Sequence, residues 1–277
     1  MSFDTRYTPS REGRTSLALE GVVKATTFVQ PRAMTPACAS AAIRAAPAVD
    51  AEQVDQLLFG ETFDVLDEAD GFAWGQARRD GYVGFVEAAA LAPQEELATH
   101  RVSAIRTYAF ARPDIKSPAL GPYSLNSLVT EEAREGRFVK AVGSGWFVAS
   151  HLEAVGRFET DHAAVAERFL NAPYLWGGRE SLGLDCSGLV QQALLACGQA
   201  CPRDTDQQVG LGAAVDPLDL QRGDLVFWRG HVAILLDPRR VIHANAHHMA
   251  VAIEPLADAL SRIAANGGGE PTAYRRP

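Results

Sequence analysis

The chain has 277 residues, of which 47% are hydrophobic and 22% charged, and its formal net charge is -8. This length predicts two or three domains, and the hydrophobic share is sufficient for packed cores, which argues against a disordered chain. The negative charge disfavours nucleic-acid binding, because neutralising phosphates requires clustered Lys and Arg.

The N-terminal segment is polar, and we expect residues 1–14 to form a flexible tail. It lacks the basic start followed by an apolar stretch that a secretory signal needs. The most apolar segment nearby, residues 33–43, is interrupted by Pro36 and is too short to span a bilayer. We therefore expect a cytoplasmic protein without a membrane span, unless a signal segment has been trimmed. The cysteines also suit a reducing compartment, because they are few and irregularly spaced for a disulfide scaffold: Cys38, Cys186, Cys197 and Cys201.

Short β-type segments separated by tight turns begin at Leu57. Phe63 and Val65 alternate with polar residues, and strand-like segments follow at residues 72–76 and 82–86. Asp80-Gly81 stands between the last two and is a strong hairpin signal. Short strands at this spacing predict a small barrel.

A second set of β-type segments repeats this pattern. Residues 136–138 and 145–147 place Gly before aromatic residues much as residues 71–72 and 81–83 do. The two sets therefore look like one structural unit used twice.

Pro93 and the polar residues after it mark a boundary between the two sets. We predict one small barrel at residues 15–93 and another at 94–152, followed by a third domain at 153–277. The role of residues 15–56 and of the second barrel cannot be predicted, and the Ala-rich stretch 37–47 has no assignment.

Residues 153–277 predict an α+β domain. A helix is expected over residues 161–170, and another from Cys186 to Cys197, with Gly198 as its stop. Three apolar strands follow, at residues 224–228, 231–236 and 241–245. A helix that bears a cysteine and is followed by an antiparallel sheet is an α+β arrangement.

Cys186 stands at the start of its helix, with Asp185 placed as the N-cap. A helix N-terminus carries partial positive charge and free N–H groups, which stabilise the thiolate that attacks carbonyls. The same N–H groups can hold the oxyanion of a tetrahedral intermediate. A lone cysteine at a helix start more often only packs, so the interpretation as a nucleophile requires a base.

Two histidines downstream can supply that base. His231 begins an apolar strand, and His243 lies on the next strand, twelve residues later (243 minus 231). Adjacent antiparallel strands can place both side chains on one face, where His243 would hold the ring of His231 in the correct tautomer. Taken singly, each would be read as a core histidine, but a helix-start cysteine followed by two strand histidines favours catalysis.

These motifs resemble the successive signatures of the NlpC-type papain-like cysteine peptidases. The segments that carry the resemblance occur in order: Pro173-Tyr174-Leu175-Trp176-Gly177-Gly178, Asp185-Cys186-Ser187-Gly188-Leu189-Val190, Arg203-Asp204-Thr205-Asp206-Gln207, Arg222-Gly223-Asp224-Leu225-Val226-Phe227-Trp228 and Gly230-His231-Val232-Ala233-Ile234. The resemblance implies that Cys186 is the nucleophile, His231 the base and His243 the orienting residue. It also implies that the hydroxyl of Tyr174 lies beside the nucleophile, although a packed aromatic remains an equal alternative.

The N-terminal half resembles the bacterial SH3-like barrels that some family members carry. The arrangement is similar to the intracellular γ-D-glutamyl-diamino-acid peptidases of wall recycling, in which the first barrel closes one end of the cleft. The resemblance implies that four residues hold the free amine of an N-terminal L-Ala: Glu61, Tyr82, Asp185 and Ser187. A buried ammonium requires a carboxylate and acceptors, but Glu61 taken alone could equally be a solvated surface acid.

The predicted function follows from this resemblance. We expect hydrolysis of the γ-D-glutamyl–diamino acid bond of short peptidoglycan peptides with a free N-terminal L-Ala, without a cofactor. An amidase or acyltransferase on the same Cys-His site remains open, as does an inactive protein that binds wall fragments. A zinc site at His243, His247 and His248 is disfavoured, because no further ligands are suitably spaced. The diamino acid and the oligomeric state cannot be predicted.

Overall fold

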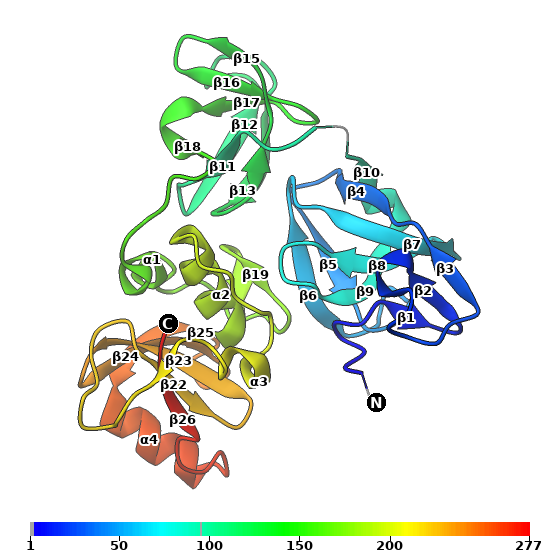
Figure 1. Cartoon of the computed structure of the whole chain (residues 1–277). Helices are drawn as coiled ribbons and strands as arrows, with labels where there is room; N and C mark the ends of the chain where they lie inside the picture. The colour runs from blue at the N-terminus through cyan, green and yellow to red at the C-terminus, as the bar shows by residue number, and fades with distance from the viewer. Residues whose placement is uncertain (1–2, 95) are drawn as a thin grey trace. The chain divides into compact units, whose positions relative to one another are not determined.

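The computed structural model describes residues 3–94 and 96–277 and divides the chain into two compact units, Met1–Val155 and Gly156–Pro277 (Figure 1). The described part of the first unit is built from strands and short 3-10 turns, and the α-helices lie in the second unit. No helix among the described residues is long and apolar enough to cross a membrane.

The first barrel contains a seven-stranded sheet of order β10-β4-β7-β8-β9-β5-β6. Its strands are β4 (Arg32–Pro36), β5 (Ser40–Arg44), β6 (Gln53–Leu58), β7 (Phe63–Ala69), β8 (Phe72–Ala77), β9 (Val83–Glu87) and β10 (Leu91–Pro93), with the 3-10 turn η2 (Ala88–Ala90) before the last. The hairpin predicted at Asp80-Gly81 is confirmed, because β8 and β9 pair antiparallel around it. Gly81 takes a φ of +82° there, and the Tyr82 N–H donates to Asp80 Oδ1 at 3.1 Å.

A small sheet, β1-β2-β3, precedes this barrel. Its elements are β1 (Ser10–Arg11), β2 (Arg14–Ser16), the 3-10 turn η1 (Leu17–Leu19) and β3 (Thr27–Val29). The described part of the segment expected as a flexible tail is instead hydrogen-bonded to the barrel. The Arg6 carbonyl accepts from the Val83 N–H at 2.7 Å, and the Tyr7 carbonyl accepts from the Gln76 side chain at 3.0 Å.

The Ala-rich stretch that had no assignment forms β5 and the turns beside it. Ala41 and Ile43 are buried in the core of the first barrel, whereas the residues that alternate with them, Ser40, Ala42 and Arg44, are only partly buried. A side chain at Gly84 on β9 would overlap Ile43, so the glycine lets β9 approach β5 closely. Small residues thus suit this strand because its neighbour lies close.

The second barrel combines the sheets β14-β11-β18 and β13-β12-β17-β16-β15. Its strands are β11 (His100–Val102), β12 (Arg106–Phe110), β13 (Ala119–Ser124), β14 (Leu128–Val129), β15 (Glu131–Glu135), β16 (Phe138–Ala141), β17 (Trp146–Val148) and β18 (Leu152–Ala154), with the 3-10 turn η3 (Ala149–His151) before the last. The sequence of three strands, one 3-10 turn and a final strand occurs in both barrels. It corresponds to the internal repeat seen in the sequence.

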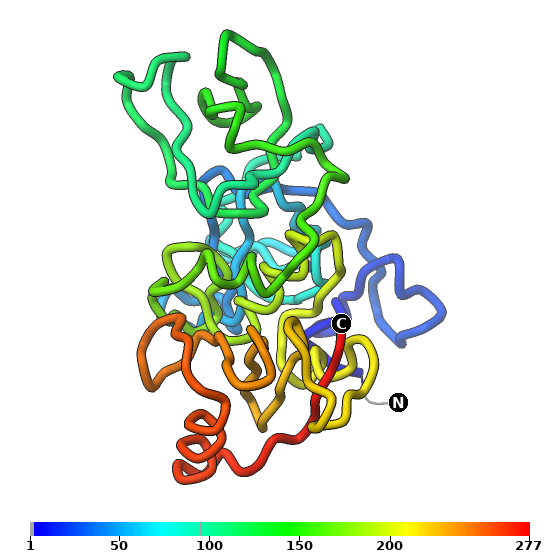
Figure 2. The backbone as a smooth tube through the Cα atoms, turned by 90° about the vertical axis from the view of Figure 1, so that its left-hand side faces the viewer, coloured from blue at the N-terminus to red at the C-terminus, as the bar shows by residue number. Residues whose placement is uncertain are grey.

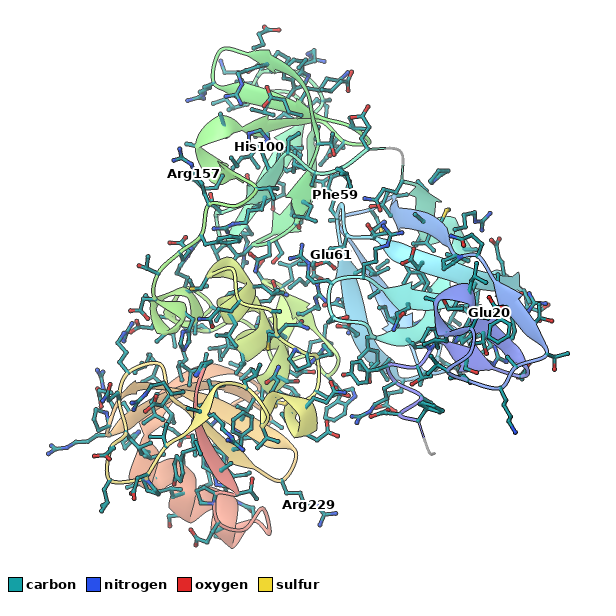
Figure 3. The ribbon with its side chains drawn as sticks, viewed as in Figure 1. Glu20, Phe59, Glu61, His100, Arg157 and Arg229 are labelled. Atoms are coloured by element: carbon teal, nitrogen blue, oxygen red, sulfur yellow. The ribbon has the colours of Figure 1, made fainter. Side chains whose placement is uncertain are left out.

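The turn that follows β6 connects the cores of the two barrels. Phe59 packs into the second core, edge-on to Tyr123 at 5.0 Å, and its carbonyl accepts from the Leu128 N–H at 2.7 Å. Figure 3 shows Phe59 and Glu61 close together at this turn. Gly60 between them has a φ of +77°, and any side chain there would overlap the Leu128 carbonyl. The close approach of this turn to Leu128 of the second barrel therefore requires a glycine at position 60.

The second unit is an α+β domain around a six-stranded sheet of order β21-β26-β22-β23-β24-β25. The sheet strands are β21 (Ala213–Ala214), β22 (Leu225–Trp228), β23 (His231–Asp237), β24 (Arg240–Asn245), β25 (Ala250–Pro255) and β26 (Ala273–Arg276). The other elements are α1 (His162–Glu167), β19 (Arg179–Glu180), β20 (Gly183–Leu184), α2 (Cys186–Ala196), α3 (Thr205–Gln208) and α4 (Leu256–Ala265). The three predicted strands correspond to β22, β23 and β24, and the two predicted helices to α1 and α2.

Helices cover both faces of this sheet, with α2 on one side and α4 on the other (Figure 1). Residues Leu256 and Ala259 of α4 pack against the alternate residues Ala233, Leu235 and Val241 of β23 and β24. Figure 2 shows the chain leaving the α4 coil and returning as the C-terminal strand β26, which pairs with β22. Because both faces are covered, β22 and β23 are apolar along nearly their whole length.

Candidate active site

Cys186 is the first residue of α2, and its side chain is buried, with 7% of the residue exposed. Asp185 caps the helix with an extended backbone, and its Oδ1 accepts from the Gly188 N–H at 2.7 Å. Apolar residues along the helix, including Leu189 and Val190, are buried and hold it in the domain. The sulfur therefore has a fixed place at the positive end of a packed helix.

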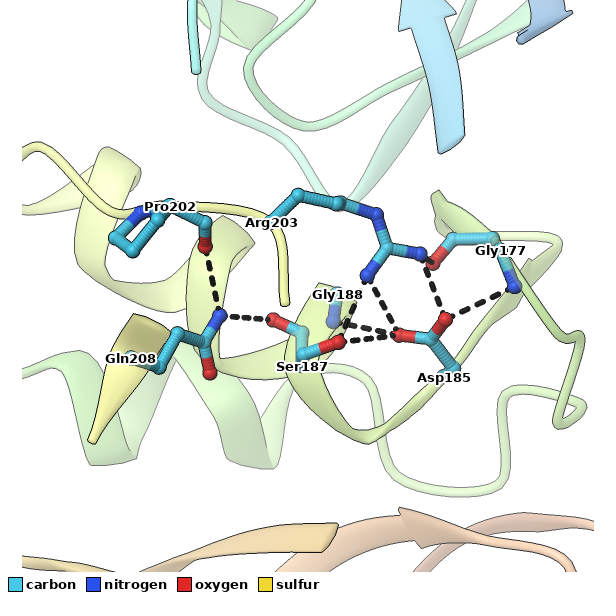
Figure 4. A network of polar contacts seen from close by, with 8 residues as sticks. Gly177, Asp185, Ser187, Gly188, Pro202, Arg203 and Gln208 are labelled. Atoms are coloured by element: carbon cyan, nitrogen blue, oxygen red, sulfur yellow. Dashed lines mark hydrogen bonds and ion pairs between the residues drawn. The ribbon is translucent and has the colours of Figure 1, made fainter. Parts of the chain in front are cut away.

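Asp185, Ser187 and Arg203 form a buried polar network beside the cysteine (Figure 4). Arg203 donates to both carboxylate oxygens of Asp185, at 3.0 and 2.6 Å, and to Ser187 Oγ at 2.8 Å. Ser187 Oγ donates in turn to Asp185 Oδ1 at 3.1 Å, and the Gly177 N–H donates to Asp185 Oδ2 at 2.9 Å. The network holds the residues on both sides of Cys186 in place.

These contacts also occupy the carboxylate of Asp185. With the bond from Gly188, its two oxygens accept five hydrogen bonds, from Gly177, Ser187, Gly188 and two nitrogens of Arg203. A carboxylate offers about four lone-pair sites. Asp185 was predicted to bind a substrate amine. Because both of its oxygens are already hydrogen-bonded, they favour a structural role, and Asp185 would act on a bound amine through its negative charge.

The surroundings of Cys186 favour its protonated form, the thiol. Burial and the negative charge of Asp185 raise its pKa to about 12, against the smaller opposing effects of the Val232 N–H, the charge of Arg203 and the Ser187 N–H. The helix N-terminus thus acts in the expected direction through Ser187, but burial outweighs it. The hydrogen bond from the Val232 N–H shows that the sulfur lies beside the beginning of β23, next to the residue that follows His231. The thiol consequently needs a base at the moment of attack.

His231 and His243 lie together at the end of the sheet. His231 Nε2 is 2.8 Å from His243 Nδ1, and His243 Nε2 is 2.7 Å from Glu254 Oε1. His243 is fully buried, and it lies opposite Ala252 on β25, which places Glu254 two residues further along on the same face. The pairing of two strand histidines predicted from the sequence is thus found as a hydrogen bond.

The surroundings of both imidazoles favour their neutral form. Burial, the neighbouring His243 and the charge of Arg262 lower the pKa of His231 to about 3, with Glu254 opposing. Burial also lowers the pKa of His243, although its hydrogen bond to Glu254 opposes this. A neutral His231 can accept a proton, which is what a general base requires.

Tyr174 lies within electrostatic range of the nucleophile. Burial raises the pKa of its hydroxyl, and electrostatic interactions with Cys186 and Asp185 raise it further. Its backbone is held between two segments, because the Tyr174 N–H donates to the Met249 carbonyl at 3.0 Å and the residue bridges Leu184. Its phenol is therefore a protonated group near the sulfur. Four of the predicted residues, Tyr174, Asp185, Cys186 and Ser187, are thus brought together.

Glu61 and Tyr82 belong to the first unit, unlike the other six predicted site residues. Glu61 is only 1% exposed, and its carboxylate pairs with Arg79 Nε at 2.5 Å and accepts from the Leu58 N–H at 3.0 Å. It is therefore a buried ion-pair partner and not a solvated surface acid. Tyr82 is also buried, with its ring edge-on to Tyr7 at 5.2 Å.

Sequence reasoning missed three charged residues around the site. Arg203 was noted only as part of a family segment, and Glu254 and Arg262 were not singled out. The one available signal was the position of Glu254 in an otherwise apolar strand, 250–255. An acidic residue there is costly to bury unless it has a partner.

A cavity of about 440 Å³ opens beside His231 and could receive part of a ligand. It is lined by Trp228, Arg229, His231, Asn245, Ala246, His247, Arg262, Ile263, Asn266 and Gly268. Among residues 3–94 and 96–277, no three His, Cys, Asp or Glu side chains are grouped to hold a metal ion.

Two sequence families match this chain. Residues 171–263 match the NlpC/P60 family, and residues 43–91 match the bacterial dipeptidyl-peptidase SH3 domain. A γ-D-glutamyl-L-lysine dipeptidyl-peptidase of Bacillus cereus is 38% identical over 120 residues, which are 40% of this chain and 36% of that protein. Dipeptidyl-peptidase 6 of Lysinibacillus sphaericus is 35% identical over 99 residues, 35% of this chain and 36% of that protein. The matched region thus spans little more than a third of either relative.

Solved structures with a similar fold are also known. A crystal structure of an NlpC/P60 family protein from Bacillus cereus superposes with a TM-score of 0.76 and 20% identity, covering 88% of this chain and 99% of that one. An NlpC/P60 endopeptidase from Photobacterium damselae superposes with a TM-score of 0.60 and 14% identity, covering 93% of this chain and 74% of that one. At these identities the likeness establishes the fold.

Proposed function

From the NlpC/P60 domain and the bacterial SH3-like domain that this chain carries, we propose that it is a cysteine peptidase acting on peptidoglycan peptides. The observation that carries the proposal is that the buried thiol at the start of α2 is in contact with the backbone N–H of Val232, the residue next to His231 of the hydrogen-bonded histidine pair. Relatives named as dipeptidyl-peptidases and peptidoglycan endopeptidases support the substrate class.

The protonation states favour a proton transfer coupled to attack. Burial raises the pKa of the Cys186 thiol and lowers the pKa of the His231 imidazole, so both shifts favour a neutral pair over a thiolate–imidazolium pair in the free protein. His231 takes the thiol proton as the sulfur attacks the carbonyl, and N–H groups at the α2 N-terminus stabilise the oxyanion. The leaving amine then takes that proton from His231, and water hydrolyses the acyl-enzyme.

The finer specificity that we propose is cleavage between γ-D-glutamate and the diamino acid of short peptides with a free N-terminal L-Ala. Glu61, Tyr82 and Ser187 are the proposed acceptors for that amine, with Asp185 contributing charge. Because Glu61 is already paired with Arg79, an ammonium would join or displace the guanidinium there. Short peptides of this kind suit wall recycling, and we propose a cytoplasmic location on that ground.

Product analysis tests this proposal. Wild-type protein should hydrolyse L-Ala-γ-D-Glu-L-Lys to L-Ala-D-Glu with a free γ-carboxyl and L-Lys, and should release L-Ala-D-Glu in the same way from the diaminopimelate counterpart. Cys186→Ala should lower the rate at least about 1000-fold, because the nucleophile acts as one unit with its base. Cys38→Ala, which alters an exposed cysteine in the first unit, is the matched control. Products that retain the γ-glutamyl bond would instead indicate an amidase or acyltransferase.

Acetylating the substrate's amine separates the peptidase proposal from the specificity proposal. Loss of cleavage with the acetylated peptide is expected if a carboxylate holds the ammonium. Equal rates on both peptides would remove Glu61 and Tyr82 from the site while leaving Cys186 and His231 in it.

A further inference from the structure

Four side chains from β23, β24, β25 and α4 form a continuous hydrogen-bonded chain. It begins at His231 Nε2, passes through both nitrogens of His243 and reaches Glu254 Oε1 over distances of 2.8 and 2.7 Å. The same oxygen of Glu254 is bonded to Nη2 of Arg262 on α4. His243 is fully buried and the Glu254 side chain is 12% exposed, so the chain is largely shielded from water.

The direction of every hydrogen bond in this chain follows from its acidic end. A carboxylate only accepts and a guanidinium only donates, so the proton between Glu254 and His243 belongs to His243 Nε2. A neutral imidazole carries a single N–H, which makes His243 Nδ1 an acceptor. His231 must then donate from its Nε2, and its Nδ1 is left as a bare lone pair.

We infer that Glu254 is a positioning residue that fixes, through His243, the tautomer in which His231 presents Nδ1 as the base. This inference rests on the proposed cysteine-peptidase function. Without an accept-only partner, His243 can carry its proton on Nδ1 and donate to His231. His231 would then hold its own proton on Nδ1, where it cannot receive one from Cys186.

Arg262 keeps Glu254 in its accept-only form. Burial opposes ionisation, but hydrogen bonds from His243 and Arg262 outweigh it and lower the pKa of Glu254 to about 2. Arg262 also disfavours positive charge on both histidines. The carboxylate therefore compensates the guanidinium at the moment when His231 becomes an imidazolium.

A purely structural alternative is that Glu254 and Arg262 only connect β25 to α4. Glu254→Gln separates the two roles, because the amide keeps the shape but can either accept from or donate to His243 Nε2. Asp224→Asn is the matched control, because Asp224 is also buried and pairs with an arginine, Arg276, without contacting a histidine. A structural role predicts similar effects in both variants.

Nitrogen-15 NMR of labelled histidines reads the tautomers directly. The wild type should show Nδ1 unprotonated and Nε2 protonated in both His231 and His243. Glu254→Gln should populate the Nδ1–H form of both rings and lower kcat about 10- to 100-fold at little changed KM, by analogy with residues that orient metal-binding imidazoles. Asp224→Asn should leave the wild-type pattern and kcat in place.

Two results would overturn the inference: Nδ1–H on His231 in the wild type, or identical tautomers in wild type and Glu254→Gln. Because the spectrum needs no substrate, it is independent of the proposed activity. Wild-type tautomers as inferred, in a protein that cleaves no peptide, would sink the proposed function and leave the positioning role of Glu254 intact.

Discussion

Replacing Arg203 by methionine removes the only cation that the structure shows bonded to the Asp185 carboxylate among the described residues. The Arg203 side chain is 1% exposed and that of Asp185 9% exposed, so neither charge can be rehydrated without opening the domain. Breaking one side of a buried pair typically costs about 3–5 kcal/mol, because the remaining charge is left uncompensated. Total stabilities are about 5–15 kcal/mol, so the loss should be large.

Urea unfolding of Arg203→Met and of the double variant Asp185→Asn/Arg203→Met measures this effect. The single variant should lose about 3–5 kcal/mol of unfolding free energy, and the double variant should regain part of it because no charge stays unpaired. A loss below about 1 kcal/mol in the single variant, the range of exposed ion pairs, would refute this account of the network.

Three further predictions concern packing, reactivity and pH. Gly60→Ala should destabilise the protein by more than about 2 kcal/mol, because the new side chain would overlap the Leu128 carbonyl. The control Gly71→Ala has a similar φ but open space around it, and should cost about 1 kcal/mol. Equal melting temperatures of the two variants would contradict this prediction. The rate at which iodoacetamide alkylates Cys186, followed by peptide mass spectrometry, should keep rising with pH above pH 9, because burial raises the pKa of this thiol to about 12. A rate that reaches its plateau below pH 8 would contradict the raised pKa. The folded protein lowers the pKa of His231 to about 3, so between about pH 6.5 and pH 3 the unfolded chain binds one more proton than the folded protein at this residue. The free energy of unfolding should therefore fall as the pH is lowered through this range. His231→Gln should lessen this pH dependence, and an unchanged pH dependence would contradict the lowered pKa of His231.

The sequence was sufficient to place those candidate site residues whose signals are local in their helix and strands. Cys186 follows a capping residue at the start of an apolar helix, and the two histidines each lie within a short apolar strand. The contact between the two histidines requires only a tight turn between neighbouring antiparallel strands. The turn residues between residues 231 and 243 predict that turn. The same holds for the Asp80-Gly81 hairpin, whose turn chemistry is fixed by two residues.

Glu254 and Arg203 could not be predicted because their roles depend on non-local geometry. Glu254 reaches His243 through the register of β24 on β25, which the sequence does not specify. Arg203 reaches Asp185 from a loop 18 residues away. The Ala-rich strand β5 was missed because alanine has low strand propensity, and here packing against Gly84 overrides it.

The most direct test asks whether the sulfur of Cys186 becomes acylated. The protein is mixed with L-Ala-γ-D-Glu-L-Lys, the reaction is quenched rapidly, and the peptides of the protein are analysed by mass spectrometry. The proposed mechanism predicts a thioester adduct with the mass of the L-Ala-D-Glu acyl group on the peptide that contains Cys186, and its absence from Cys186→Ala. Undiminished turnover by Cys186→Ala, or an acyl adduct on a different residue, would contradict it.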